Sequence, residues 1–70
     1  MNEIIITGEY IRLDALLKFA SLTASGGESK IRILAGDVLF NGEPCSQRGK
    51  KCRSGDIIEL DGQKIQIKCS

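Results

Sequence analysis

The chain has 70 residues, of which 41% are hydrophobic and 27% charged, and its formal net charge is +1. This composition excludes a disordered chain, and the length predicts one domain, residues 1–70, whose small core supplies only a few kcal/mol of net stability. A net charge of +1 excludes a strongly basic protein, so any preference for nucleic acid must come from how the charges are distributed.

The first third of the chain predicts two short extended segments and then a helix. Glu3–Thr7 is an apolar, β-branched run typical of a strand, and Tyr10–Ile11 is a second extended piece. An apolar stripe with helical spacing follows: Leu13, Leu16, Leu17 and Ala20. Arg12 stands at or just before the N-cap of this helix, where it is a poor capping residue but can reach outward. We expect Phe19, near the helix end, to join the core.

A second helix is predicted to begin at Ser25, after a short connection. Ser25 and Glu28 form an S-x-x-E capping box. Gly26 and Gly27 in the first turn each cost about 1 kcal/mol relative to Ala inside a helix. Without Cβ atoms, however, they let an anion approach the unpaired amides, and Lys30 one turn later can face the same anion. Simple flexibility or close helix packing also explains the glycine pair.

The apolar face of the second helix is predicted from the spacing of Ile31, Leu34 and Ala35, with Ile33 beside it. Gly36 then ends the helix. Two helices joined by so short a connection must pack against each other. The expected helix–helix core consists of Leu13, Leu16, Leu17, Ile31 and Leu34.

Two hairpins are predicted in the second half. The first runs from Val38–Phe40 through an Asn41-Gly42 turn, and the second joins Asp56–Leu60 to Lys64–Lys68 through Asp61-Gly62. Alternation in the last strand places Ile65 and Ile67 inward. The element order predicts an α+β fold with two short consecutive helices packed on a small, mostly antiparallel sheet.

Residues 46–55, here called the basic loop, form the only strongly biased segment. Four cations occupy six positions, and no acid lies between Glu43 and Asp56. Such a cluster makes a local field that attracts phosphates, although a merely solvated loop has the same composition. The cations are Arg48, Lys50, Lys51 and Arg53. They could also lower the pKa of Cys52, which should be alkylated fastest of the three cysteines if it is exposed among these cations.

The three cysteines, Cys45, Cys52 and Cys69, predict reduced thiols rather than a disulfide framework, because their number is odd and no signal peptide precedes them. A metal site is not expected, since zinc needs about four ligands and the chain has no His. No apolar run approaches the roughly 18 residues that span a membrane. These features favour a cytoplasmic protein.

Residues 12–55 resemble the S-four domain, the αL RNA-binding motif. The matching pieces are Arg12-Leu13-Asp14, Ser25–Lys30, Gly36–Gly42 and Ser54-Gly55-Asp56, in register. The Gly-Gly pair and the basic loop are closer still to the stand-alone YaaA/YbcJ-like subgroup. Gly26 and Ile31 depart from the family pattern, which has basic residues there, so the basic loop would have to compensate.

The resemblance implies a non-catalytic protein that binds structured RNA through its phosphates, with ribosomal RNA or a ribosome-assembly particle as the first expected target and a tRNA-like RNA as the second. No cofactor, metal or membrane is expected, and the protein is expected to be a monomer. The expected RNA-binding residues are Arg12, Ser25, Gly26, Gly27, Lys30, Asn41, Arg48, Lys50, Lys51 and Arg53. Turn chemistry also explains Asn41. Aromatic stacking on bases is not expected if Phe19 and Phe40 are buried.

Alternatives from other classes stay open. A ubiquitin-like sulfur carrier has a similar size, but it needs a C-terminal Gly-Gly, whereas this chain ends Lys68-Cys69-Ser70. A small protein–protein adaptor has no specific evidence in its favour. A helix-turn-helix DNA reader fits the two helices but not the glycine pair. Catalysis has little support, because the chain offers no His, no paired nucleophile and base, and no phosphate-binding loop.

Overall fold

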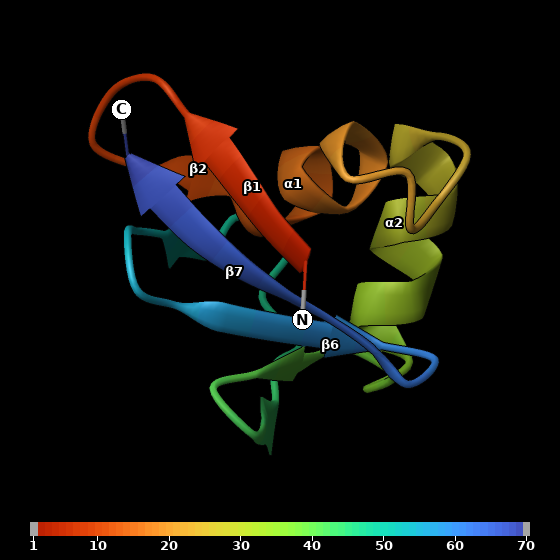
Figure 1. Cartoon of the computed structure of the whole chain (residues 1–70). Coiled ribbons are helices and arrows are strands. Elements are labelled where there is room, and N and C mark those ends of the chain that lie inside the picture. Colours follow the sequence, from red (N-terminus) through yellow and green to blue (C-terminus); the bar gives the residue numbers. More distant parts are fainter. Residues whose placement is uncertain (1, 70) are drawn as a thin grey trace.

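The computed structural model describes residues 2–69 and contains two short helices and seven strands (Figure 1). In chain order these are β1 (Asn2–Ile6), β2 (Ile11–Arg12), α1 (Leu13–Phe19), α2 (Gly26–Leu34), β3 (Leu39–Phe40), β4 (Glu43–Pro44), β5 (Lys51–Cys52), β6 (Ile57–Leu60) and β7 (Gln63–Cys69). Neither helix is long and apolar enough to cross a membrane.

The strands form one five-stranded sheet and a separate two-stranded ribbon. The sheet has the order β1-β7-β6-β3-β4, in which only the β1–β7 pair is parallel. Strand β2 pairs with β5 in the ribbon. Figure 1 shows β1 and β7 side by side and the two helices next to each other. The predicted α+β fold with a mostly antiparallel sheet is confirmed.

Both predicted tight turns have the backbone that their sequences require. Asn41 and Gly42 have φ of 51° and 89°, and Asp61 and Gly62 have 53° and 79°. Two consecutive residues with positive φ are typical of the type I′ hairpin turn, which matches the twist of the flanking strands. Beyond the second turn, Ile65 and Ile67 are buried as the alternation predicted.

The core lies between α1, α2 and the inner faces of β6 and β7. Its fully buried members include Leu13, Leu16 and Leu17 of α1, as predicted from the helical stripe. The rest of the cluster comes from several elements: Ile6, Ile33, Val38, Cys52, Ile58, Leu60, Ile65 and Ile67.

The predicted apolar face of α2 was wrong. Ile31 is 67% exposed and Leu34 is 57% exposed, whereas Ile33 is fully buried. The reason is a polar contact: the buried Ser29 hydroxyl lies 2.6 Å from that of Thr23. This bond satisfies both hydroxyls inside the protein, so the helix turns the small Ser29 inward together with Ile33 one turn later.

Phe19, expected in the core, is instead 60% exposed. It is the last residue of α1, and the chain turns back directly after it, with the Leu22 amide donating to the Leu17 carbonyl at 2.9 Å. This return packs Leu22 against the core. Phe19 is therefore left at the surface, beyond the point where the helical stripe still faces the core.

Candidate nucleic-acid interface

The β2–β5 ribbon gathers part of the predicted site. Ile11 is opposite Cys52 and Arg12 is opposite Lys51. Cys52 is fully buried and Ile11 packs against the core. Because successive side chains on a strand point to opposite faces, Arg12 and Lys51 lie together on the outward face. Residues far apart in sequence thus supply adjacent cations on one small surface.

Tyr10, the residue before β2, lies against cations of this outward face. The Lys51 ammonium lies 5.0 Å from the centre of the Tyr10 ring, and the Arg53 guanidinium carbon lies 5.9 Å from it. Both distances fall within the range of cation–π attraction. Tyr10 therefore holds two cations of the basic loop in place. We call Arg12, Lys51, Arg53 and Tyr10 the basic face.

The basic loop also caps helix α1. The Leu13 amide donates to the Lys50 carbonyl at 2.9 Å, and the Asp14 amide donates to the Arg48 carbonyl at 3.1 Å. A guanidinium has no acceptor atom, so the N-cap residue Arg12 cannot satisfy these first-turn amides itself. The loop backbone does so instead, so capping makes no demand on the Arg12 side chain.

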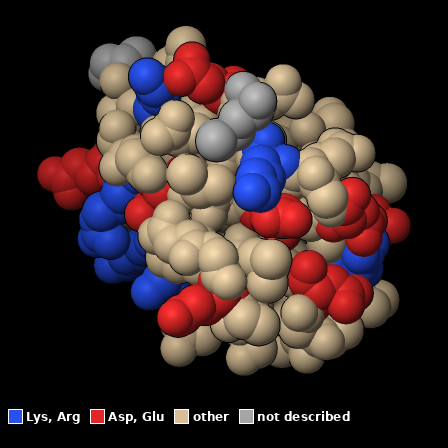
Figure 2. Space-filling view, turned by 60° about the horizontal axis from the view of Figure 1, so that its bottom comes forward, with Lys and Arg blue, Asp and Glu red and all other residues tan. Residues whose placement is uncertain are grey.

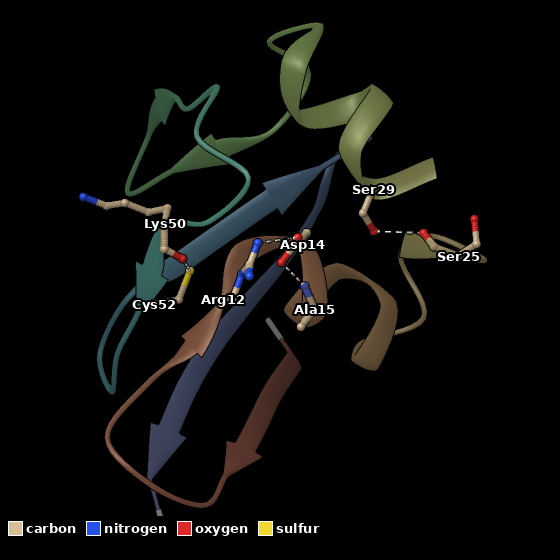
Figure 3. A network of polar contacts seen from close by, with 7 residues as sticks. All are labelled: Arg12, Asp14, Ala15, Ser25, Ser29, Lys50 and Cys52. Atoms are coloured by element: carbon tan, nitrogen blue, oxygen red, sulfur yellow. Dashed lines mark hydrogen bonds and ion pairs between the residues drawn. The ribbon is translucent and has the colours of Figure 1, made fainter. Parts of the chain in front are cut away.

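Arg12 is held beside an acid and a glycine, as Figure 3 shows for the acid. Its guanidinium lies 3.1 Å from the Asp14 carboxylate, and the Asp14 carboxylate also accepts the Ala15 amide at 2.8 Å. A Cβ atom at Gly49 would lie 3.7 Å from the guanidinium. The Arg12 side chain keeps 54% of its surface exposed, so it remains open to an anion.

The start of α2 has the predicted cap. Ser25 accepts the Glu28 amide at 3.1 Å, and Glu28 in turn accepts the Ala24 amide at 2.6 Å. Among residues 2–69, no atom lies within 4 Å of a Cβ built on Gly26, and one on Gly27 meets only the Ser25 hydroxyl at 3.8 Å. Close helix packing therefore does not explain the glycine pair.

Arg12 and Gly26 line one shallow hollow, which joins the start of α2 to the basic face. The other residues of this Arg12 hollow are Asp14, Ala15 and Lys18. Lys18 was not singled out from the sequence. Its spacing of four residues from Asp14 places both side chains on the same side of α1. This helical spacing is the signal in the sequence that could have assigned Lys18 to the site. Lys30 is exposed on α2, one turn beyond the glycine pair.

The remaining predicted residues lie apart from the basic face or have structural partners. Lys50 points away from Arg12 in Figure 3, and its ammonium lies 5.1 Å from the Phe40 ring centre. Asn41 accepts the Ile57 amide at 2.8 Å and donates to Asp56 at 3.2 Å, so the hairpin uses both ends of its amide. Arg48 is exposed.

Many of the Lys and Arg side chains gather on one side of the molecule. Figure 2 shows a dense group of Lys and Arg side chains at its left edge, the side on which Figure 1 shows the cyan segment after β5. Arg32 lies elsewhere, paired with Asp37 at 2.8 Å and with Asp61. The Arg32 hydrogen bond lowers the pKa of Asp61. Arg32 is thus engaged in tying α2 to the β6–β7 turn.

Cys52 does not meet the condition of exposure under which the sequence predicts an activated thiol. Its side chain is fully buried, and its thiol lies 3.6 Å from the Lys50 carbonyl. Burial raises the pKa of Cys52 to about 12, since a thiolate would be desolvated there. The neighbouring cations point outward. All three cysteines are free, and the described residues contain no cluster of three or more metal-binding side chains.

Comparison with known proteins yields two matches. A family model described as "S4 domain" matches residues 4–68. The chain is also 41% identical over 61 residues to a protein of Bacillus subtilis (strain 168) named "Probable ribosome maturation protein RlbA". That match covers 87% of this chain and 86% of the relative.

Proposed function

Because the chain belongs to the S4 domain family, as its motifs predicted, we propose that it is a non-catalytic, single-domain RNA-binding protein. Its target is structured RNA, which it recognises mainly through phosphates. The relative is named for ribosome maturation, so ribosomal RNA or an assembly particle is the first candidate target, with a tRNA-like RNA second. Such a role belongs in the cytoplasm.

The observation that carries this proposal is the convergence of Arg12, Lys51 and Arg53 on the outward face of one ribbon. Three adjacent cations on a backbone held by helix α1 suit an array of phosphates, and arginine can bind a phosphate with two hydrogen bonds. The bare first turn of α2 lies across the Arg12 hollow and extends the same surface. Folded RNA presents arrays of phosphates along its backbone.

The contact set follows from this geometry. We propose that Arg12, Lys51 and Arg53 are the main phosphate contacts, with the amides of Gly26 and Gly27 next to them. Lys18 and Lys30 extend the surface along the helices, Ser25 holds the amides in place as the cap, and Arg48 and Lys50 contribute at the other side of the basic loop. We assign Asn41 to the hairpin rather than to the RNA.

Salt dependence of binding tests the proposal directly. If about four to six phosphates are contacted, log affinity for a structured RNA should fall with log salt at a slope of about −3 to −5. Lys51→Gln should make this slope shallower by about 0.7 to 0.9, since one phosphate contact is lost. The measurement is filter binding of a ribosomal RNA fragment across a salt series.

Lys64→Gln is the matched control, because it removes the same charge from an exposed strand lysine whose partner is Glu59 at 4.0 Å. Its slope and affinity should stay at the values of the unmodified protein. Equal effects of the two substitutions would mean that overall charge, not the basic face, governs binding. Absence of measurable RNA binding at low salt would overturn the proposed function itself.

A further inference from the structure

A second hollow lies between β1, the start of β2 and the end of α1. Its volume is about 290 Å³, and its lining is mostly apolar: Ile5, Ile6, Thr7, Tyr10, Ile11 and Phe19. We call it the Phe19 hollow. Ile5 is 63% exposed, Phe19 60% and Tyr10 42%. Contiguous exposed apolar patches, especially those rimmed by polar residues, are a feature of interaction and ligand-binding sites.

The Phe19 hollow shares one side chain with the basic face. Tyr10 lines the hollow, and the same ring lies against Lys51 and Arg53. An apolar, partly aromatic surface therefore adjoins two cations through a single ring. The occupant that fits must combine a flat apolar part with a nearby negative charge.

We propose that the Phe19 hollow receives one unpaired RNA base, whose own phosphate lies against Lys51 and Arg53. This inference rests on the proposed function and names the kind of RNA that the site prefers. Bases inside a duplex are already stacked, so only a base in a bulge, a loop or at an end can enter. Phe19 provides the stacking surface, and Thr7 adds a residue with a polar side chain to the lining.

Charge complementarity favours a nucleotide over a protein segment. An apolar peptide would fill the hollow but would leave Lys51 and Arg53 without an anionic partner. The expectation that stacking was absent depended on a buried Phe19, and that side chain is exposed. The exposed ring thus changes the expected target from any folded RNA to one with an unpaired nucleotide.

Two RNAs that differ in one nucleotide test the proposal. One is a short duplex carrying a single bulged 2-aminopurine, and the other is the same duplex fully paired. The protein should bind the bulged RNA more tightly and should quench its fluorescence. Phe19→Leu, which keeps an apolar side chain but removes the ring, should weaken binding to the bulged RNA by about 5- to 150-fold, the range that base stacking supplies.

Two further variants control the measurement. Phe19→Tyr should keep both the preference and the quenching, because the ring remains. Leu34→Ala, on the exposed side of α2, should leave both unchanged. Thermal melts should show that all variants stay folded, since Phe19 and Leu34 are each more than half exposed.

The outcomes separate this inference from the proposed function. Equal affinity for the two duplexes, unaffected by Phe19→Leu, would overturn the base site while leaving phosphate binding intact. Failure to bind either duplex would overturn both. Sedimentation analysis adds one more decisive result: if Phe19→Leu abolished a dimer instead of RNA discrimination, the hollow would be a self-association surface and the base site would be wrong.

Discussion

The amide of Leu13 donates to the carbonyl of Lys50 at 2.9 Å, so the first buried residue of helix α1 is bonded to the middle of the basic loop. The Asp56 carboxylate fixes the far end of that loop by accepting the Arg53 amide at 2.7 Å. A loop held at two points loses less conformational freedom when it binds a ligand. The fold therefore presents the cations of the basic face on an ordered backbone.

Asp14 competes with RNA for Arg12, and this gives a first prediction. Asp14→Asn should raise the affinity for structured RNA by up to about 5-fold, because an exposed ion pair is worth about 0–1 kcal/mol. Asn keeps an oxygen for the Ala15 amide, so the helix start should persist. Filter binding at low salt measures the effect.

Glu59→Gln is the control for that change, since Glu59 pairs with Lys64 away from the ribbon and its loss alters the net charge equally. Its affinity should rise less than that of Asp14→Asn. A drop in affinity on Asp14→Asn would instead show that Asp14 orients Arg12 for binding.

A matched pair of isoleucines tests the observed face of α2. Ile33→Ala should lower the free energy of unfolding by about 2–5 kcal/mol, because it leaves a cavity in the core. Ile31→Ala should change it by no more than about 0.5 kcal/mol, since that side chain is 67% exposed. Urea unfolding compares the two, and the reverse order would restore the stripe predicted from the sequence.

The sequence predicted what depends on near neighbours. Ser25 caps α2, Asn41-Gly42 and Asp61-Gly62 form hairpin turns, and Leu13–Leu17 buries one face of α1. Each of these depends on interactions over a few residues, which local patterns encode. The same patterns, together with their order, were enough to indicate the fold class.

What the sequence missed depends on contacts between distant segments. The Thr23–Ser29 hydrogen bond lets α2 bury the polar Ser29 together with Ile33, which a count of apolar residues cannot anticipate. Tyr10 was not assigned to the site because its neighbours Lys51 and Arg53 belong to a segment far along the chain, at and just after the opposite strand of the ribbon. The same pairing directs Cys52 inward, although its sequence neighbours are cations.

Burial of Cys52 reverses the expected order of thiol reactivity. With its pKa raised to about 12, this thiol should be the slowest of the three to react with iodoacetamide in the folded protein. Cys69 is exposed and should react first. Mass spectrometry of partially alkylated protein, after digestion, identifies the sites. Fast labelling of Cys52 would mean that the ribbon opens readily.

The same thiol makes stability depend on pH. The pKa of Cys52 in the folded protein lies above its ordinary value of 9.0. The contribution of the protonated thiol to the free energy of unfolding is therefore fully present below about pH 9 and is lost as pH rises toward about 12. The loss should approach about 1.4 kcal/mol per pH unit within that window. Cys52→Val removes the titrating group. The urea unfolding midpoint of this variant should therefore fall less between about pH 8 and about pH 10.5 than that of the unmodified protein.

Gly26 and Gly27 provide the last prediction, because phosphate approach to their amides and simple flexibility have opposite consequences for RNA binding. Gly27→Asp should leave the protein as stable as before or more stable, since Asp is favourable in a first helical turn and a Cβ there meets only the Ser25 hydroxyl at 3.8 Å. If RNA phosphates approach these amides, the carboxylate should repel them and weaken binding at least severalfold.

Gly27→Ala separates the effect of added side-chain volume from the effect of added negative charge. It should stabilise the helix by up to about 1 kcal/mol and weaken RNA binding less than Asp does. Filter binding at two salt concentrations, with a thermal melt of each variant, gives both quantities. Unchanged affinity in a stably folded Gly27→Asp protein would limit the RNA contacts to the basic face.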